Sequence, residues 1–206
     1  MADTRLARLN GEWRRVPRAL EFAEFARQRV GLRRYQHTIS VTQTLYVIAQ
    51  DLELSSTSAV AAGLLHDSCK GLKNDVMLAE ADRYGIPVTD LQRERPSLLH
   101  GHVAAEVCRI ELALDDADAF EAIYWHVTGR PGLGLLGRAL FLADFSEPLR
   151  NHPASAAARE VYDAQGFDAA LVYAAEAKMT FVENKGVTVD PRTRAFHEWL
   201  LADVPS

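Results

Sequence analysis

Cysteine and long apolar runs are both scarce in this chain. The 206 residues include two cysteines, Cys69 and Cys108. Two cysteines are too few for a disulfide framework, so we interpret both as small buried apolar residues of a protein in a reducing compartment. No apolar stretch approaches the roughly 18 residues that cross a bilayer, and the N-terminus lacks the continuous apolar core of a secretory signal. These absences predict a cytoplasmic protein with no membrane partner.

A strong excess of one charge is also missing. The net charge is −5, and 28 acidic residues are interspersed with 23 basic ones, which argues against a surface that tracks nucleic acid. An anionic substrate would therefore have to be held by a local group of cations. With 48% hydrophobic residues the chain can bury one sizeable core. We predict a loosely ordered, Arg-rich leader over residues 1–15 and a single helical domain over residues 16–206.

The alternating pattern of a half-buried strand does not occur convincingly anywhere in the sequence. Apolar residues instead recur at helical spacing, between breaks at Gly and Pro and caps at Ser, Thr or Asp. We predict caps at Ser55 or Ser56, at Thr89 and at Asp116, and a helix start at the dipeptide 190–191, which is Asp-Pro. The fold class is therefore predicted to be all-α. The main expected helices cover approximately residues 17–30, 33–51, 56–66, 74–84, 98–112, 117–127, 133–147, 156–162, 167–185 and 191–201.

The adjacent pair His66 and Asp67 ends a helix that is rich in small residues. Neighbouring side chains on a helix point about 100° apart, so this pair can bind a metal ion only if other helices supply more ligands. Four further residues are candidates because they lie on or next to apolar helical faces: His37, His100, His126 and Asp144. A lone carboxylate at Asp144 would cost several kcal/mol, which favours a metal or a cationic partner there.

Histidines and carboxylates together form a mixed set of nitrogen and oxygen donors. Such a set suits iron, manganese, zinc or cobalt better than calcium or magnesium. Six ligands exceed what one open catalytic ion takes, whereas two ions that share a bridging carboxylate would use them all. A pair of this kind activates water and neutralises phosphoryl oxygens, which predicts hydrolysis of a phosphate ester or anhydride. The alternative is a buried polar network of the same side chains without metal.

Two cations lie near this set in the sequence. Lys70 follows Asp67 by one helical turn, so its ammonium could reach a substrate phosphate. Arg130 lies in a loop rich in Gly and Pro and could bind another phosphate. As an alternative, each is a solvated surface charge. The remaining histidines are interpreted as surface or satisfied core residues: His102, His152 and His197.

The order of the candidate ligands resembles the signature of the HD phosphohydrolase superfamily. His37, the doublet at 66–67 and Asp144 follow one another in that order on a helical chain. Four segments resemble one branch in particular, the YqeK family of bacterial symmetrical diadenosine tetraphosphate hydrolases: residues 34–38 (RYQHT), 66–70 (HDSCK), 125–132 (WHVTGRPG) and 143–150 (ADFSEPLR). The doublet alone is a weak signal, but the four segments together are specific, and the match spans about residues 32–199.

The resemblance implies an HD-domain helical bundle with a buried metal centre. It implies two iron ions, with manganese, cobalt or zinc as other candidates, and cleavage of diadenosine tetraphosphate (Ap4A) into two ADP. The implied metal ligands are His37, His66, Asp67, His100, His126 and Asp144. The implied substrate pocket contains Lys70, Thr128, Gly129, Arg130, Glu147 and Arg150, and the catalytic residues are Asp67, Lys70 and Arg130.

The chain departs from the family pattern after the third histidine, where Gly101 and His102 replace the usual small residue and Pro. Either His100 or His102 could then be the ligand, and we expect His100. One alternative function is an HD-type nucleotidase that acts on a nucleoside monophosphate, a dNTP or a ppGpp-like alarmone. A second is a non-catalytic helical scaffold that binds metal. The sequence leaves a homodimer open.

Overall fold

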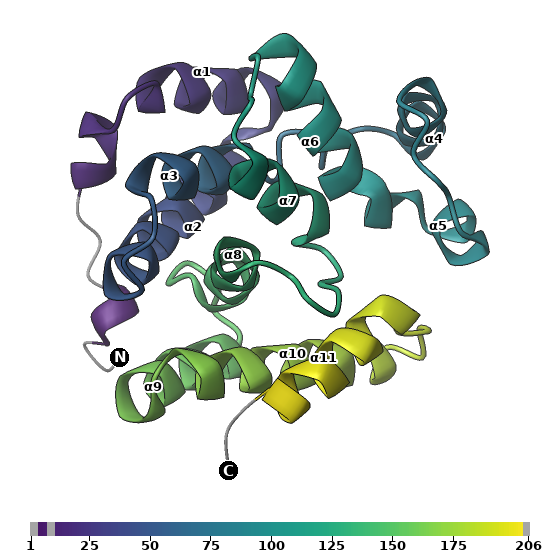
Figure 1. The fold of residues 1–206 in the computed structure, drawn as a ribbon. Helices are drawn as coiled ribbons and strands as arrows, with labels where there is room; N and C mark the ends of the chain where they lie inside the picture. The colour runs from purple at the N-terminus through teal and green to yellow at the C-terminus, as the bar shows by residue number, and fades with distance from the viewer. Residues whose placement is uncertain (1–3, 8–10, 204–206) are drawn as a thin grey trace.

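The computed structural model describes residues 4–7 and 11–203, and within these ranges it contains helices and no strands (Figure 1). The predicted all-α fold class is therefore confirmed. None of the described helices is both long enough and apolar enough to cross a membrane. The α-helices are α1 (Ala19–Arg29), α2 (Leu32–Asp51), α3 (Ser56–Leu65), α4 (Asn74–Arg83), α5 (Asp90–Glu94), α6 (His100–Glu111), α7 (Ala117–Trp125), α8 (Leu135–Ser146), α9 (Pro153–Gln165), α10 (Phe167–Glu183) and α11 (Pro191–Asp203). The short 3-10 helices are η1 (Arg5–Ala7), η2 (Glu12–Arg15) and η3 (Pro96–Leu99).

Side-chain caps begin three of the helices where the sequence predicts them. The Ser55 hydroxyl accepts the Ser58 N–H before α3, and the Asp116 carboxylate accepts the Ala119 N–H before α7. Thr89 forms a reciprocal capping box at the start of α5. Each cap satisfies an N–H that has no partner within the helix, which explains why the helix starts there.

Four predicted helices differ from the observed ones in their first turn, and those expected from residues 17 and 133 begin at Ala19 and Leu135. The helix expected from residue 98 begins as η3, with Pro96 in its first turn, and continues as α6 from His100. The helix expected over 156–162 already begins at Pro153, because the ring of His152 accepts the Ala154 N–H and caps it. Pro tolerates the first turn of a helix, where its missing N–H costs nothing.

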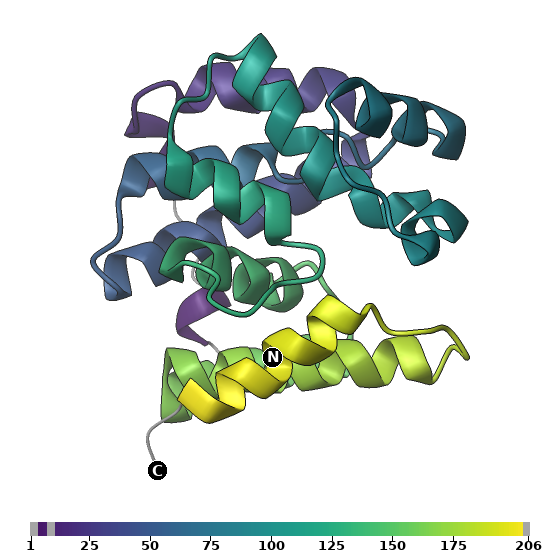
Figure 2. The same ribbon diagram turned by 45° about the vertical axis from the view of Figure 1, so that its right-hand side comes forward.

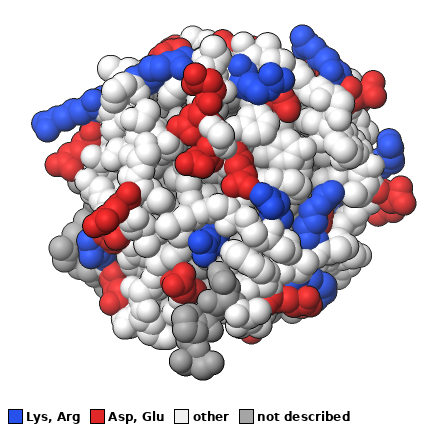
Figure 3. Space-filling view, in the orientation of Figure 1, with Lys and Arg blue, Asp and Glu red and all other residues white. Residues whose placement is uncertain are grey.

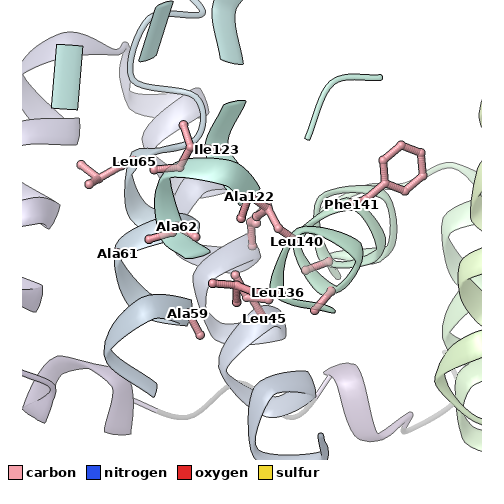
Figure 4. Packing of buried hydrophobic residues seen from close by; sticks show 14 of the residues in the cluster. Leu45, Ala59, Ala61, Ala62, Leu65, Ala122, Ile123, Leu136, Leu140 and Phe141 are labelled. Carbon is pink, nitrogen blue, oxygen red and sulfur yellow. The ribbon is translucent and has the colours of Figure 1, made fainter. Parts of the chain in front are cut away.

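Helix α8 lies at the centre of the fold. It packs against α2, α3 and α7 on one side and against α9 and α10 on the other, as the two views in Figures 1 and 2 show. Figure 4 shows Leu136 and Leu140 of α8 among side chains of α2, α3 and α7, whereas Phe141 points to the opposite side. The Phe141 ring lies 5.2 Å from that of Phe196 on α11. Because α8 is buried on both sides, Asp144 near its end is brought into the interior.

The described part of the N-terminal segment packs onto the domain. Leu6 is 0% exposed and Trp13 is 1% exposed, and the backbone N–H of Arg5 donates to the Asp163 carboxylate on α9. These contacts concern the described residues 4–7 and 11–15, and the loosely ordered leader stays a prediction. Residues 1–3 and 8–10 lie outside the described residues, and the boundary between residues 15 and 16 stays a prediction.

The close approach of α3 to α2 predicts a stability effect at Gly63. A Cβ atom there would lie 2.8 Å from the Thr42 Cα atom, so Gly63→Val should force the two helices apart. We expect the free energy of unfolding to fall by about 2–3 kcal/mol in urea titrations. Gly71→Val is the control, because a Cβ atom at Gly71 has its nearest neighbour at 3.9 Å. Equal stability of the two variants would contradict the close contact.

Candidate metal centre

The predicted metal ligands come from five helical elements and meet at one buried place. His66 and Asp67 follow the end of α3, His100 begins α6, and His126 follows the end of α7. His37 lies in α2 and Asp144 in α8, where the Asp144 Oδ1 atom is 3.1 Å from His37 Nε2. Four of the six residues are at most 4% exposed: His66, Asp67, His100 and His126.

Asp67 is the residue that the two halves of this cluster share. Its Oδ1 atom lies 3.0 Å from His100 Nε2 and 3.8 Å from His126 Nε2. Its Oδ2 atom lies 3.8 Å from His37 Nε2 and 3.8 Å from His66 Nε2. Each carboxylate oxygen thus faces a different pair of imidazoles. Asp67 forms one set with His37 and His66 and a second set with His100 and His126, and within each set the ligand atoms lie within 4.8 Å of one another. A carboxylate in this position can bridge two ions.

Three of the histidines are oriented by backbone carbonyl groups. A ring nitrogen of each, Nδ1, lies within hydrogen-bond distance of the carbonyl three residues earlier: 2.8 Å for His66 and Gly63, 2.6 Å for His100 and Ser97, and 2.8 Å for His126 and Ile123. Since the carbonyl can only accept, Nδ1 carries the hydrogen, and Nε2 presents its lone pair to the centre. This is the tautomer that a metal-binding histidine needs.

The inward-facing nitrogen atoms fit a metal. His66 Nε2 is buried and has no hydrogen-bond partner. His100 Nε2 and His126 Nε2 are 3.0 Å apart, and with hydrogens on both Nδ1 atoms their lone pairs repel each other. A cation between these atoms removes the repulsion and gives the His66 nitrogen a partner. The donor set of imidazole and carboxylate is the one expected for iron, manganese, cobalt or zinc.

The electrostatics of the cluster also favour bound cations. Burial lowers the pKa of His66 to about 4 and that of His100 to about 3, so both are neutral, as metal ligands must be. Burial alone would raise the pKa of Asp67, but the surrounding histidines hold it well below the usual range. For His37, burial lowers the pKa, and hydrogen bonds to Asp144 and Glu147 outweigh this and raise it to about 9. The carboxylates therefore attract positive charge to this place.

Glu147 lies behind His37 and orients it. Its Oε1 atom lies 3.0 Å from His37 Nδ1, and its Oε2 atom accepts the Leu149 N–H at 2.7 Å. With Nδ1 engaged in this way, His37 Nε2 is directed at Asp144 and Asp67. Both oxygen atoms of Glu147 are thus engaged, although the residue also lines the neighbouring cleft, and its predicted place in the substrate pocket stays a prediction.

Three cations surround the carboxylates of the cluster. Lys70 Nζ lies 3.1 Å from His100 Nε2, and Arg150 donates to Asp144 Oδ1 at 2.6 Å. Arg34 donates to Asp67 Oδ2 at 2.7 Å. On the face seen in Figure 3, acidic and basic side chains are interspersed. The three cations therefore form the local group that an anionic substrate would need in a chain with net negative charge.

Arg34 is a residue of this cluster that the sequence did not indicate, and Lys178 is a neighbour of Phe141 on α8 that it did not indicate either. Arg34 precedes His37 by three residues, so both lie on one face of α2, a spacing that could have identified it. Lys178 on α10 lies 4.3 Å from the Phe141 ring centroid. Burial lowers its pKa to about 8, and the charges of Asp144 and Asp67 act on it. No sequence motif marked Lys178, because its position depends on how α10 packs against α8.

The loop after His126 is held against the C-terminal helix. Gly129 has φ +67°, and a Cβ atom there would lie 2.3 Å from the Phe196 ring. The Thr128 hydroxyl is buried and donates to the Gly129 carbonyl at 3.0 Å. Arg130 forms an ion pair with Glu121, and its guanidinium lies 5.8 Å from the Trp125 ring centroid. Arg130 also donates to the Pro131 carbonyl at 3.1 Å, so its contacts are with α7 and with its own loop. Its predicted catalytic role stays a prediction.

Of the two neighbouring histidines on α6, His100 belongs to the cluster. The ring of His102 instead lies 4.2 Å from the ring of Tyr124 and 5.1 Å from that of Trp125. It is buried among aromatic side chains, so His102 is a core residue, but its buried Nδ1 atom has no hydrogen-bond partner among the described residues and is not satisfied as expected.

A cleft of about 1000 Å³ opens beside His37, between the start of α2 and the loop that follows α8. It brings the metal centre within reach of a ligand as large as a nucleotide. Its lining includes His37, Arg34 and Arg150, which also contact the carboxylates of the cluster.

Residues 34–170 match the family model of the HD domain. The chain belongs to the HD domain family. This HD-domain chain is 30% identical to the symmetrical bis(5'-nucleosyl)-tetraphosphatase of Bacillus subtilis, over 85% of its own length and 94% of the relative. It is also 30% identical to the protein of that name from Halalkalibacterium halodurans, over 82% of its own length and 90% of the relative.

A solved structure shares the fold of this HD-domain chain. It is a predicted HD superfamily hydrolase from Clostridium acetobutylicum, described as involved in NAD metabolism, with a TM-score of 0.84, 26% identity and coverage of 89% of this chain and 97% of that one. The resemblance to the HD superfamily and its symmetrical tetraphosphatases is confirmed, and the protein is an HD-type phosphohydrolase.

The shared position of Asp67 predicts that its loss removes the metal. We expect Mn²⁺ or Fe²⁺ to raise the Tm of the metal-free wild-type protein, because an ion that binds only the folded state stabilises it. Asp67→Ala should show no such rise and should retain no metal in elemental analysis. Asp82→Ala, which removes an exposed carboxylate on α4, is the control and should behave as wild type. Full metal content in Asp67→Ala would rule out the assignment.

The contact of Glu147 with His37 predicts an effect on metal affinity. Glu147→Ala should weaken metal binding by about 10–100-fold, as is usual when a group that orients a ligand is lost. Glu147→Gln should restore most of the affinity, since its amide oxygen can still accept the hydrogen of His37 Nδ1. Competition with a chelator of known affinity measures both. Unchanged metal binding together with a raised KM would instead make Glu147 a substrate residue.

Proposed function

We propose that this HD-domain protein hydrolyses Ap4A symmetrically into two ADP. The single observation that carries the proposal is the carboxylate of Asp67, whose two oxygen atoms face separate pairs of imidazoles. It is supported by relatives named symmetrical bis(5'-nucleosyl)-tetraphosphatase, which match most of the chain. We further propose that the protein acts in the cytoplasm, which fits its low cysteine content.

Two divalent ions, for which we propose iron with manganese, cobalt or zinc as other candidates, would supply an activated water and neutralise phosphoryl oxygens. His37, His66, Asp67, His100, His126 and Asp144 would hold them. The neutral rings of His66 and His100 and the ionised aspartates prepare the site, because they need no proton loss before the ions bind. His37, whose pKa is raised to about 9, must release its proton when a metal ion binds.

The cations of the chain itself hold the polyphosphate. Phosphoryl transfer depends on positioning and charge neutralisation more than on covalent help. Lys70, Arg34 and Arg150 already lie beside the cluster, within 2.6–3.1 Å of its ligand atoms. A substrate phosphate that enters can accept hydrogen bonds from these three cations, which then bind the phosphate and the cluster together. The charge that develops on the departing ADP is met by these groups and by Arg130 if it exchanges Glu121 for a phosphate.

The products of Ap4A cleavage test the proposal directly. Metal-loaded protein incubated with Ap4A should release ADP as the sole product, measured by ion-exchange chromatography. AMP together with ATP would show asymmetric cleavage and contradict the proposal. Inactivity on Ap4A with turnover of a nucleoside monophosphate, a dNTP or ppGpp would favour another HD-type nucleotidase. Inactivity on all of them would favour the non-catalytic scaffold.

The different contacts of Lys70 and Arg130 predict different kinetic effects. Lys70→Ala should keep its metal and lose on the order of 100-fold in kcat/KM for Ap4A, because its ammonium lies inside the cluster. Arg130→Ala should also keep its metal, with a higher KM and a smaller overall loss. Arg109→Ala is the control, since Arg109 likewise forms an ion pair with a glutamate but on the exposed side of α6. Loss of metal in Arg130→Ala would contradict its proposed role.

A further inference from the structure

The cleft beside His37 has a basic wall that continues from the metal centre. Arg33, Arg34 and Arg150 line it, together with Gln36 and Asn151. Arg33 makes no ion pair with any residue in the described ranges. The acid in the lining, Glu147, has both carboxylate oxygens engaged by His37 and the Leu149 N–H. The wall is therefore suited to an anion that extends outward from the metal centre.

Two exposed leucines flank the same cleft. Leu32 is 74% exposed and Leu149 is 54% exposed, and both line it. Leaving a leucine in water forgoes most of the free energy that its burial would give. Apolar side chains next to a few polar groups are typical of a small-molecule site, and the flat face of a nucleobase suits such a pair. The amides of Gln36 and Asn151 can pair with a base edge or with ribose hydroxyls.

The size of the cleft selects which part of the substrate it can hold. Its volume of about 1000 Å³ is sufficient for a nucleoside with its phosphates. A second cavity, between Thr128 and Lys178, has a volume of about 90 Å³. That space holds a few waters or one phosphate group but no nucleoside.

We propose that the cleft binds one nucleoside diphosphate half of the substrate, with the base held by Leu32 and Leu149 and the phosphates held by Arg34 and Arg150. This inference rests on the proposed function and specifies where one half of the dinucleotide lies. The phosphates lie next to the metal centre and the base lies farther out, because the two arginines touch the metal-binding carboxylates. The two leucines are the solvent-exposed part of the lining.

The test separates binding of the base from binding of the phosphates. In the metal-loaded full chain, Leu32→Ser and Leu149→Ser should each raise the KM for Ap4A by about five- to tenfold and leave kcat within about twofold. Inhibition by ADP should weaken by the same factor, and inhibition by pyrophosphate, which has no base, should not change. Leu20→Ser is the matched control, because Leu20 is 66% exposed on α1 and does not line the cleft.

Three results would overturn the inference. An unchanged KM in both leucine variants would show that no base lies between them. Equal weakening of ADP and pyrophosphate would show that the cleft binds phosphate alone, and an equal effect in Leu20→Ser would show a general disturbance. If the wild-type protein fails to cleave Ap4A, the proposed function falls. Calorimetric titration of ADP and of pyrophosphate into the same variants then still tests the cleft, which is supported if ADP binding alone weakens.

Discussion

Everything in this structure depends on the carboxylate of Asp67 and the imidazoles around it. The helices bring together nitrogen lone pairs and carboxylates in a buried place, where Arg34, Arg150 and Lys70 contact them. Without compensating charge this arrangement costs free energy. Bound metal ions make the free energy of this arrangement favourable, because each lone pair and each carboxylate then becomes a ligand. The fold thus holds a set of ligand atoms that cations of the chain already contact and that metal ions would bind.

The ends of helices make this arrangement possible. The last carbonyl groups of a helix have no N–H partner within it, and the carbonyls of Gly63 and Ile123 lie in the last turns of α3 and α7. The histidines that follow these helices satisfy the carbonyls with their own ring N–H groups. A single hydrogen bond therefore completes the helix end, selects the tautomer and directs the other nitrogen at the metal centre. This explains why His66 and His126 lie where helices stop, whereas His37 and Asp144 lie within α2 and α8.

The sequence allowed the helices and the six candidate ligands to be predicted, because both follow from local periodicity, caps and a short ordered set of motifs. The features that could not be predicted depend on contacts between elements that are distant in the sequence. Glu147 orients His37 across 110 residues of sequence, and the positions of Arg34 and Lys178 depend on which face of α2 and α10 is turned inward. The cleft has no signal in the sequence, since a loop and a helix start form it together. Leu6 and Trp13 were missed because isolated apolar residues among arginines show no period.

The contact between Gly129 and Phe196 has a consequence for how the protein matures. The loop that carries the segment after His126 rests on a ring from the last helix, so this loop reaches its final shape only after α11 has been synthesised and has docked. A ribosome-bound chain that has just exposed α8 already contains all six candidate ligands, yet it lacks the support for that loop. The final packing of this loop is therefore a late event, completed only when residue 196 has been added and α11 has docked.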